Sequence, residues 1–212
     1  MPVAAQPQVL TVTRVAPIAE LEFSSLYAQT RIFDVRVFRW TQRDGRDVLT
    51  PDDGFIVVPA VFSIDPYETV FIRVEPRAIA ATSIEQSYKV IVTRVIPGAA
   101  TPPPTARRVE TPLFEPPTSP ALDPSVTLKA TAPGRADLTV ENGGNEHLYL
   151  GNVSIEIAQR KIFAGKIAGY VLANSTQTFH LRVDEVFADT NGDLTFDDDR
   201  GRQQKVRITV IR

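Results

Sequence analysis

The chain has 212 residues, enough for one large or two ordinary domains that bury hydrophobic cores without covalent staples. It contains no cysteine, which excludes disulfides and thiolate metal sites but does not decide the cellular compartment. The formal net charge is -2, and Lys and Arg are scattered among Asp and Glu, so nucleic acid is not expected as a partner.

The N-terminal part of the chain shows the period of two that is typical of β-strands. Residues 9–15 (VLTVTRV) are rich in β-branched side chains and predict a first strand, and residues 19–23 predict a second. In residues 33–40 one face is apolar and the other is mixed, so we expect one face to lie in a core. Trp40, the only tryptophan, is expected to fill the space between two sheets.

Turn residues separate the strands that follow. Asp44 and Gly45 predict a hairpin turn. Residues 55–58 predict a short strand that ends at Pro59, because proline cannot donate to a sheet ladder. Two further strands are predicted over residues 69–74 and 85–97. Short strands at this spacing, separated by Gly, Pro and Asp, indicate an all-β sandwich.

Prolines divide the chain near its middle. Residues 98–106 (GAATPPPTA) predict a loop, and residues 107–115 predict the last strand of a first domain. Residues 116–124 (PPTSPALDP) form a stiff Pro-rich connector, so we expect domains over residues 1–115 and 125–212. The second domain again shows short strand-like segments, at residues 126–131, 136–141, 147–157, 169–175 and 178–181.

The order of these signals resembles a known family. A strand ending in Trp40, the segment Phe62-Ser-Ile-Asp-Pro66 and Arg73 seven residues later are similar to the first domain of the periplasmic pilus chaperones of the chaperone-usher pathway. The segments Gly169-Tyr-Val-Leu and Thr178-Phe-His-Leu resemble their second domain. Arg108, a few positions before Pro-Leu-Phe, is similar to the divergent archaic branch.

The resemblance implies a fold and a function. The fold would be two immunoglobulin-like β-sandwich domains set at an angle. The function would be to bind pilus subunits in the periplasm by donor-strand complementation and to deliver them to an outer-membrane usher. It implies self-association through the same strand as a further interaction, and it implies no cofactor and no ATP.

The resemblance also implies a site for the C-terminal carboxylate of a subunit. Arg14, Arg94 and Arg108 are the candidates, because a guanidinium makes paired, charge-assisted hydrogen bonds to a carboxylate. The alternative for each is an ordinary solvated strand arginine. Val109, Thr111 and Leu113 alternate on one face and are expected to fill the groove of the subunit.

A second implied feature is structural. Arg73 and Glu85 are candidates for a buried ion pair within the first domain, with Gln86 as the alternative partner. A buried arginine without a carboxylate would cost several kcal/mol. Substitution of Glu85 is therefore expected to impair folding more than function.

Catalysis and metal binding are not expected. His147 and His180 lie in separate strand-like segments without a nucleophile motif, so a structural or surface role is favoured for both. Residues 189–199 (DTNGDLTFDDD) place oxygens at spacings of two, yet Leu194 and Arg200 occupy the positions where a calcium loop needs Gly and a bidentate Glu. Asn191 followed by glycine predicts a tight hairpin turn instead.

Membrane insertion is not expected either, because no apolar run approaches roughly 20 residues. The start of the sequence, MPVAAQPQVL, lacks the basic beginning and long apolar stretch of a signal peptide, so an exported protein would be represented here in its mature form. The competing hypotheses are a structural or adhesive cell-surface protein built of the same sandwiches and a calcium-dependent binding module, because a fold does not specify a function.

Overall fold

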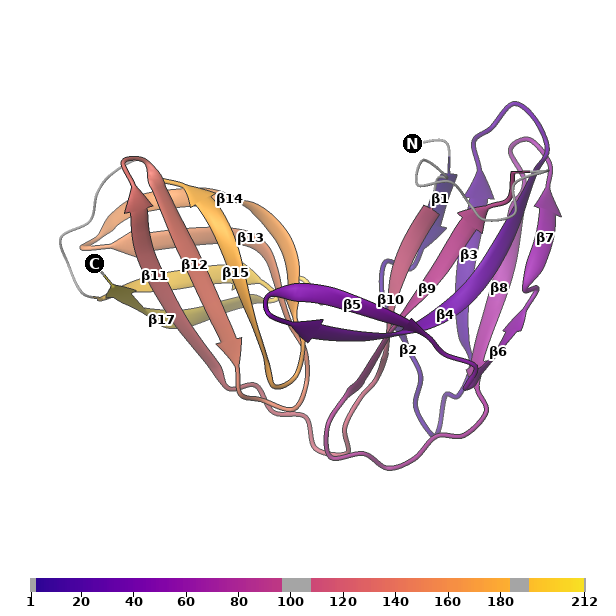
Figure 1. Cartoon of the computed structure of the whole chain (residues 1–212), viewed down its shortest axis with the longest axis horizontal. Helices are drawn as coiled ribbons and strands as arrows, with labels where there is room; N and C mark the ends of the chain where they lie inside the picture. Colours follow the sequence, from indigo (N-terminus) through magenta and orange to yellow (C-terminus); the bar gives the residue numbers. More distant parts are fainter. Residues whose placement is uncertain (1–2, 97–107, 184–190, 212) are drawn as a thin grey trace. The chain divides into compact units, whose positions relative to one another are not determined.

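The computed structural model describes residues 3–96, 108–183 and 191–211. These residues form strands and loops and contain no helix, so none of them belongs to a helix that could cross a membrane (Figure 1). The chain divides into two compact units. The first comprises residues 1–41, 48–82 and 86–118, and the second comprises residues 42–47, 83–85 and 119–212. The second unit thus includes two short segments that the sequence places in the first domain.

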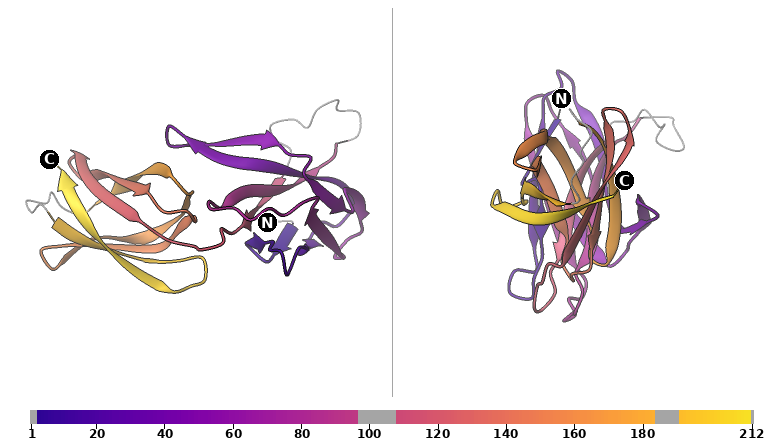
Figure 2. Two further views of the ribbon diagram at one scale, coloured as in Figure 1. Left: turned by 90° about the horizontal axis from the view of Figure 1, so that it is seen from below. Right: turned by 90° about the vertical axis from the view of Figure 1, so that its left-hand side faces the viewer.

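The first unit is built from two sheets. One sheet has the order β1 (Val3–Gln6), β3 (Ala19–Ser25), β8 (Thr69–Pro76) and β6 (Phe55–Val58). The other has the order β2 (Leu10–Thr11), β10 (Arg108–Glu115), β9 (Gln86–Arg94), β4 (Arg31–Arg43) and β5 (Arg46–Pro51), with β7 (Val61–Ile64) paired to β4. Figure 2 shows these strands from two further sides.

The core of the first unit follows from the alternation of side chains along the strands. Phe33, Val35 and Val37 of β4 are buried on one face, as the sequence predicts. The ring of Phe33 lies 4.9 Å from that of Phe23 and 5.7 Å from that of Phe62, measured between centroids. These rings come from both sheets, and burying them supplies much of the hydrophobic stabilisation of this unit.

The beginning of the chain differs from the prediction. The predicted strand over residues 9–15 is reduced to β2, and β1 precedes it. β1 pairs with β3 in one sheet, whereas β2 pairs with β10 in the other, so the chain changes sheets around Pro7. β1 was missed because alanines make up half of its residues and alanine carries little strand preference.

Two turn signals predicted from the sequence are confirmed in the first unit. Asp44 and Gly45 connect β4 to β5 with positive φ angles of 51° and 68°, the region that Gly and Asp tolerate best. β6 spans residues 55–58, ends before Pro59 and lies at the edge of its sheet. The turn at Asp44 and Gly45 and the end of β6 before Pro59 are therefore as the sequence predicts.

The second unit is one sheet of seven strands. Their order is β14 (Arg160–Val171), β13 (Leu148–Ile157), β16 (Asn191–Asp197), β17 (Gln203–Ile211), β11 (Pro124–Ala132), β12 (Arg135–Asn142) and β15 (Ser175–Arg182). One face of every strand contributes to a single core. The sheet curls around this core, and its two edge strands, β14 and β15, contact each other. As in the first unit, one strand pair, β11 with β17, is parallel.

The predicted turn at Asn191 and Gly192 is wrong. Both residues lie within β16, where they pair with Thr209 and Ile208 of β17. A Cβ atom on Gly192 would come within 2.7 Å of the carbonyl oxygen of Glu156, so this glycine permits close approach of β13 rather than a turn. The hairpin itself exists, but its turn lies at residues 198–201 and ends at Gly201 with φ of 73°.

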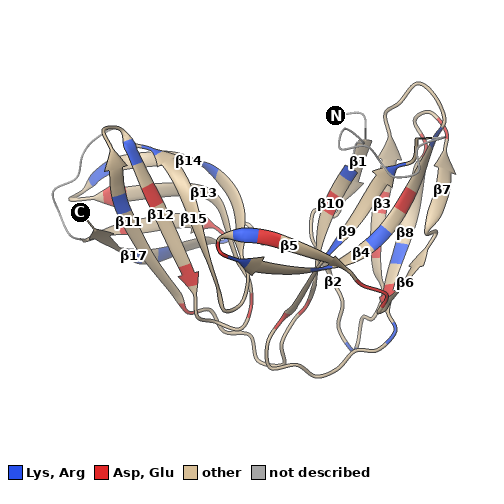
Figure 3. Ribbon diagram, viewed as in Figure 1, with Lys and Arg blue, Asp and Glu red and all other residues tan. Residues whose placement is uncertain are grey.

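Basic and acidic side chains are interspersed over the strands of both units, as the scattered charges of the sequence predict (Figure 3).

Candidate functional site

The first candidate site is the edge strand β10. It pairs with β9 along its whole length, from Arg108 opposite Thr93 to Glu115 opposite Gln86. On its other side β2 covers only Leu113 and Phe114. Among the described residues, nothing pairs with the outer edge of residues 108–112. An unpaired edge of this kind is a template for another strand.

The three predicted groove-filling residues do not point outward. Leu113 is fully buried in the core of the first unit, Thr111 is buried, and Val109 packs half-buried against the same core. The predicted alternation of side chains is confirmed, but the apolar face of β10 packs into the core of the first unit. The prediction that these side chains are free to enter a groove of another protein is therefore wrong for this structure.

The opposite face of β10 carries an ion cluster that the sequence did not reveal. Lys89 Nζ lies 3.1 Å from Glu110 Oε2, and Arg108 Nη2 lies 2.6 Å from Glu110 Oε1. Lys89 Nζ also lies 4.4 Å from the centre of the Trp40 ring. The sequence around Lys89 does not reveal this cluster, because the residues that contact Lys89 lie far away in the sequence, on β4 and β10.

Trp40 is buried, but not in the space between the two sheets. It lies on the face of β4 opposite the core residue Val37, with its ring centre 6.1 Å from that of Phe114. The prediction that Trp40 fills the space between the sheets is therefore wrong. Its position three residues after Val37 places it on the other face, where its ring contacts Lys89 of β9 and Phe114 of β10.

The three candidate arginines are not brought together. Arg108 begins β10, whereas Arg14 lies beyond β2 and acts electrostatically on Glu115 at the other end of β10. Eight strand residues span about 23 Å from first to last. Arg14 and Arg108 are therefore too far apart to hold one carboxylate.

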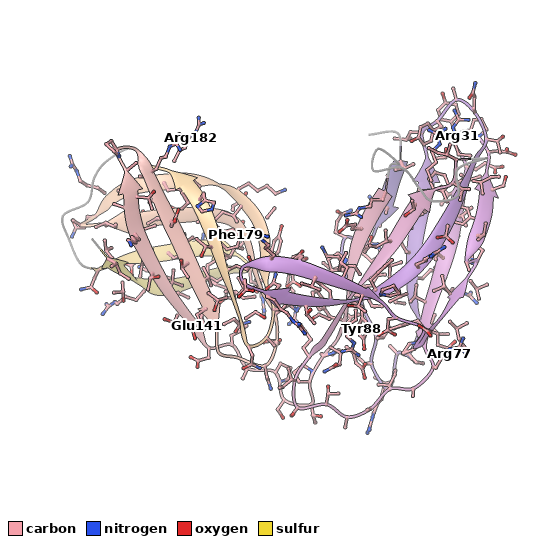
Figure 4. The ribbon with its side chains drawn as sticks, viewed as in Figure 1. Arg31, Arg77, Tyr88, Glu141, Phe179 and Arg182 are labelled. Carbon is pink, nitrogen blue, oxygen red and sulfur yellow. The ribbon has the colours of Figure 1, made fainter. Side chains whose placement is uncertain are left out.

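Arg94 lies close to Arg108 in register but faces the other way. It is opposite Phe33 of β4 on the core side of the sheet, whereas Arg108 is opposite Thr93 on the outer side. The guanidinium of Arg94 lies 5.7 Å from the centre of the Tyr27 ring. Figure 4 shows Arg31, which contacts the same ring, and Tyr88 at opposite ends of the first unit.

Besides the cluster at Glu110, the first unit contains a network of polar side chains around Tyr88. Arg39 donates to the hydroxyl of Tyr88 over 3.2 Å and to the side chain of Gln86 over 2.8 Å, and it pairs with Asp52. Burial raises the pKa of Tyr88 and also that of the Glu115 carboxyl, against the opposing charge of Arg39. Glu115 is 6% exposed, and its Oε1 has no hydrogen-bond partner within the described residues.

The predicted buried pair of Arg73 and Glu85 is wrong. Arg73 is exposed on β8 and pairs with Glu20 of β3 over 3.4 Å. Gln86, the alternative, accepts from Arg39 instead. Strand alternation explains the error, because Arg73 lies between the core residues Ile72 and Val74 and must point away from the core.

Glu85 belongs to the second unit, where it binds His147. Both Glu85 oxygens lie 2.9 Å from His147 Nδ1, and His147 Nε2 lies 2.9 Å from Asp199 Oδ2. The backbone nitrogen of His147 also donates to Glu85 over 3.1 Å. The side chains of Glu85 and His147 are 2% and 12% exposed. This cluster joins residues 83–85, the start of β13 and the turn after β16.

The two carboxylates fix the charge of this histidine. Burial alone would lower the pKa of His147, but the hydrogen bonds to Asp199 and Glu85 outweigh it and raise the pKa to about 9. The hydrogen bond from His147 lowers the pKa of Asp199. His147 therefore carries a proton on both ring nitrogens at neutral pH, in a structural role that agrees with the sequence prediction.

The acidic residues of the former calcium candidate have other partners. Asp198 accepts hydrogen bonds from the backbone of Arg200 and Arg202 within the turn, and Asp197 accepts one from Asn152. Asp199 binds His147. Residues 189 and 190, which begin the candidate loop, lie outside the described residues, as does the predicted loop over residues 98–106.

Comparison with known proteins adds the fold. No protein-family model matches the chain, and no curated protein matches its sequence. Solved structures do match over nearly their whole length. A chain in the CsuC–CsuE chaperone–tip adhesion subunit complex of the archaic Csu pili of Acinetobacter baumannii is 20% identical, with full coverage of both chains and a TM-score of 0.69.

Two further structures agree. The CupB2 chaperone of Pseudomonas aeruginosa is 17% identical with a TM-score of 0.62, and 98% of this chain and 100% of that chain are covered. The chaperone DraB of E. coli is 12% identical with a TM-score of 0.63, and 99% and 96% are covered. These matches confirm the resemblance predicted from the sequence at the level of the fold. The chain has the two-domain β-sandwich fold of the pilus chaperones of chaperone-usher systems.

Proposed function

We propose that the chain is a periplasmic chaperone that binds pilus subunits by strand addition and delivers them to an outer-membrane usher. The observation that carries this proposal is the unpaired edge of residues 108–112 on β10. The fold supports it, since similar structures are described as a chaperone with a tip adhesion subunit and as the SafB chaperone with the SafA pilin.

Strand addition suits the chemistry of this edge. Unpaired N–H and C=O groups on residues 108–112 can form main-chain hydrogen bonds with an extended segment of a subunit, which gives affinity without a large apolar contact. Val109, Thr111 and Leu113 remain in the core and hold β10 straight against β9. The same edge can pair with a second copy of the chain, so we expect weak self-association that a subunit displaces.

Hydrogen exchange tests the role of this edge directly. The chain is co-expressed with candidate pilus subunits, and backbone exchange is compared between the free chain and the purified complex. The outward-facing amides of residues 108–112 are expected to exchange at least tenfold more slowly in the complex, because they become hydrogen-bonded.

Strand β6 is the matched control, since it is the edge of the other sheet in the same unit. Its amides are expected to exchange equally fast in both samples. Unchanged exchange at residues 108–112 would exclude strand addition at this edge. If the chain instead stays attached to the cell surface and purifies with no subunit, it is a structural or adhesive protein.

A further inference from the structure

Strand β6 is an edge strand without charged side chains. Its residues, Phe55–Val58, form one end of their sheet, and all of them are apolar. The terminal strands β5, β14 and β15 instead present exposed charged side chains, among them Arg46, Lys161 and Arg182. Such charges protect an edge, because an apolar edge strand readily pairs with another chain. β6 lacks this protection.

The backbone of β6 directs hydrogen-bonding groups toward the edge. Arg77 N donates to Gly54 O over 2.7 Å, and the register of β6 and β8 then makes residues 54, 56 and 58 the hydrogen-bonded positions. In an antiparallel ladder these positions alternate with residues whose N–H and C=O point to the other side. The N–H and C=O groups of Phe55 and Val57 therefore point away from β8, where no strand of the described residues pairs with β6.

The outward face of the strand is also apolar. Ile56 and Val58 are 41% and 57% exposed, and Phe71 of the neighbouring strand β8 is 55% exposed. Val58 and Phe71 line one pocket together with Pro59, Glu20 and Arg73. Exposed apolar side chains beside an unpaired edge indicate a surface that associates with another strand.

Hydrogen-bond geometry identifies a second copy of β6 as a strand that fits. Antiparallel pairing about Ile56 sets Phe55 opposite Val57 of the second copy, and the two-fold axis repeats this pair. Both residues of each pair exchange hydrogen bonds, so every outward N–H and C=O of Phe55 and Val57 is used. Pairing about Val57 would instead set Phe55 opposite Pro59, which has no N–H. The favoured register also places Ile56 against Ile56 of the second copy.

We propose that β6 is a self-association strand, through which two copies of the chain pair in an antiparallel, two-fold arrangement centred on Ile56. Both copies use the same strand, so the pair is closed and does not grow into a fibre through β6. The contact is small because each strand has four residues, so the dimer is weak and transient. The inference does not rest on the proposed function, since residues 108–112 lie in the other sheet.

The simpler explanation is that β6 is a protected edge after all, because short strands and proline both limit strand pairing. Pro59 removes neither of the outward N–H groups, however, since these belong to Phe55 and Val57. A protected edge predicts no association that depends on Ile56. The two explanations therefore differ in a quantity that can be measured.

Opposite charges at position 56 test the pairing. Ile56→Glu and Ile56→Lys each set like charges against each other across the two-fold axis, whereas an equimolar mixture of both variants sets unlike charges there. Self-association of the full chain is measured by sedimentation equilibrium from about 10 µM to about 1 mM, a range that includes a dissociation constant on the order of 100 µM. Ile32→Glu and Ile32→Lys are the matched controls, since Ile32 lies on β4 of the other sheet and is also 41% exposed.

Association is expected to weaken at least about tenfold in each Ile56 variant and to return in their mixture, since about 1.4 kcal/mol corresponds to a tenfold change. The Ile32 variants, alone or mixed, are expected to associate like the wild type. Three results would each overturn the proposal. They are no association of the wild type over this range, unchanged association of the Ile56 variants, and no gain in their mixture.

A second measurement covers a folding defect in the variants. Backbone hydrogen exchange of the wild type is compared at the two ends of the concentration range, and the amides of Phe55 and Val57 are expected to exchange severalfold more slowly at the higher concentration. Equal exchange at both concentrations would overturn the proposal. Slower exchange at residues 108–112 alone would overturn it as well, because the association would then lie at β10.

The proposed function is tested separately. A subunit that adds to β10 leaves β6 uncovered, so association through β6 is expected to persist in the complex with a subunit. Failure to recover any subunit would refute the proposed function and not the pairing of β6. Loss of the Ile56 effect with normal recovery of subunits would refute the pairing of β6 alone.

Discussion

Each unit contains a cluster of three charged side chains, and the signs of the charges in one cluster are opposite to those in the other. In the second unit one cation, His147, lies between the carboxylates of Glu85 and Asp199. In the first unit one carboxylate, that of Glu110, lies between two cations. The His147 cluster of the second unit is nearly buried at all three members, whereas in the first unit Lys89 of β9 is nearly buried and Arg108 of β10 is exposed.

The two clusters are expected to differ in how much each member contributes to stability. In a buried cluster each member must stay, because removing one leaves an uncompensated charge away from water. An exposed member such as Arg108 can be replaced by water at low cost. Three substitutions or conditions sharpen this contrast, from the largest expected effect to the smallest.

The largest effect is expected for His147→Gln. Glutamine carries no charge and cannot reproduce the imidazolium, which donates from opposite sides of its ring, so the buried Glu85 loses its cationic partner. The free energy of unfolding is expected to fall by about 3 kcal/mol, as for other buried pairs that lose one partner. Chemical denaturation of the full chain measures it.

His180→Gln is the matched control. His180 also contacts a carboxylate, with Nδ1 2.7 Å from Asp137, but its side chain is 82% exposed. This substitution is expected to change the stability by less than about 0.5 kcal/mol. Equal effects of the two substitutions would show that burial does not determine how much a histidine–carboxylate contact contributes to stability.

Alkaline pH is expected to have the next largest effect. The folded-state pKa of His147 is about 9, above the ordinary value of 6.5, so its proton stabilises the folded state. That contribution is complete below pH 6.5 and is lost as the pH rises through 9. Between pH 7 and pH 10 the wild type should lose roughly 2 kcal/mol more than His147→Gln does. Parallel curves of stability against pH would contradict the assignment.

The smallest effect is expected at Glu115, whose carboxylate belongs to neither of the two ion clusters. Burial raises its pKa although Arg39 and Arg14 are near, so its ionised form is less favourable in the folded state than in water. Glu115→Gln is expected to raise the free energy of unfolding at pH 7 by about 0.5–1 kcal/mol. The gain should disappear at pH 4, where the carboxyl binds a proton in both states. A loss of stability at pH 7 would mean that Arg39 stabilises the charge more than burial opposes it.

The predictions from the sequence succeeded where one segment carries its own signal. Residues 55–58 form a strand that ends before Pro59, and Asp44 with Gly45 forms the turn between β4 and β5. Such features depend on proline lacking a donor and on glycine accepting positive φ, which are properties of single residues. The alternation in residues 33–37 likewise identified the core face of β4.

The predictions failed where two distant segments had to be matched. The sequence predicts that Arg73 pairs with Glu85, but Glu20 is the residue opposite it on β3. Val109, Thr111 and Leu113 were recognised as one face, but not as the face toward the core. Alternation defines two faces of a strand without saying which one the neighbouring sheet covers.

The sequence by itself determined that this protein is built of short strands, where several of them begin or end, and which family of folds it resembles, because strand period and turn chemistry are local. Only the tertiary structure decided that residues 108–112 have an open edge, that Lys89 meets Glu110 and that His147 meets Glu85 and Asp199. Those contacts depend on strand order and register, which arise from packing across the whole sandwich and from no single segment.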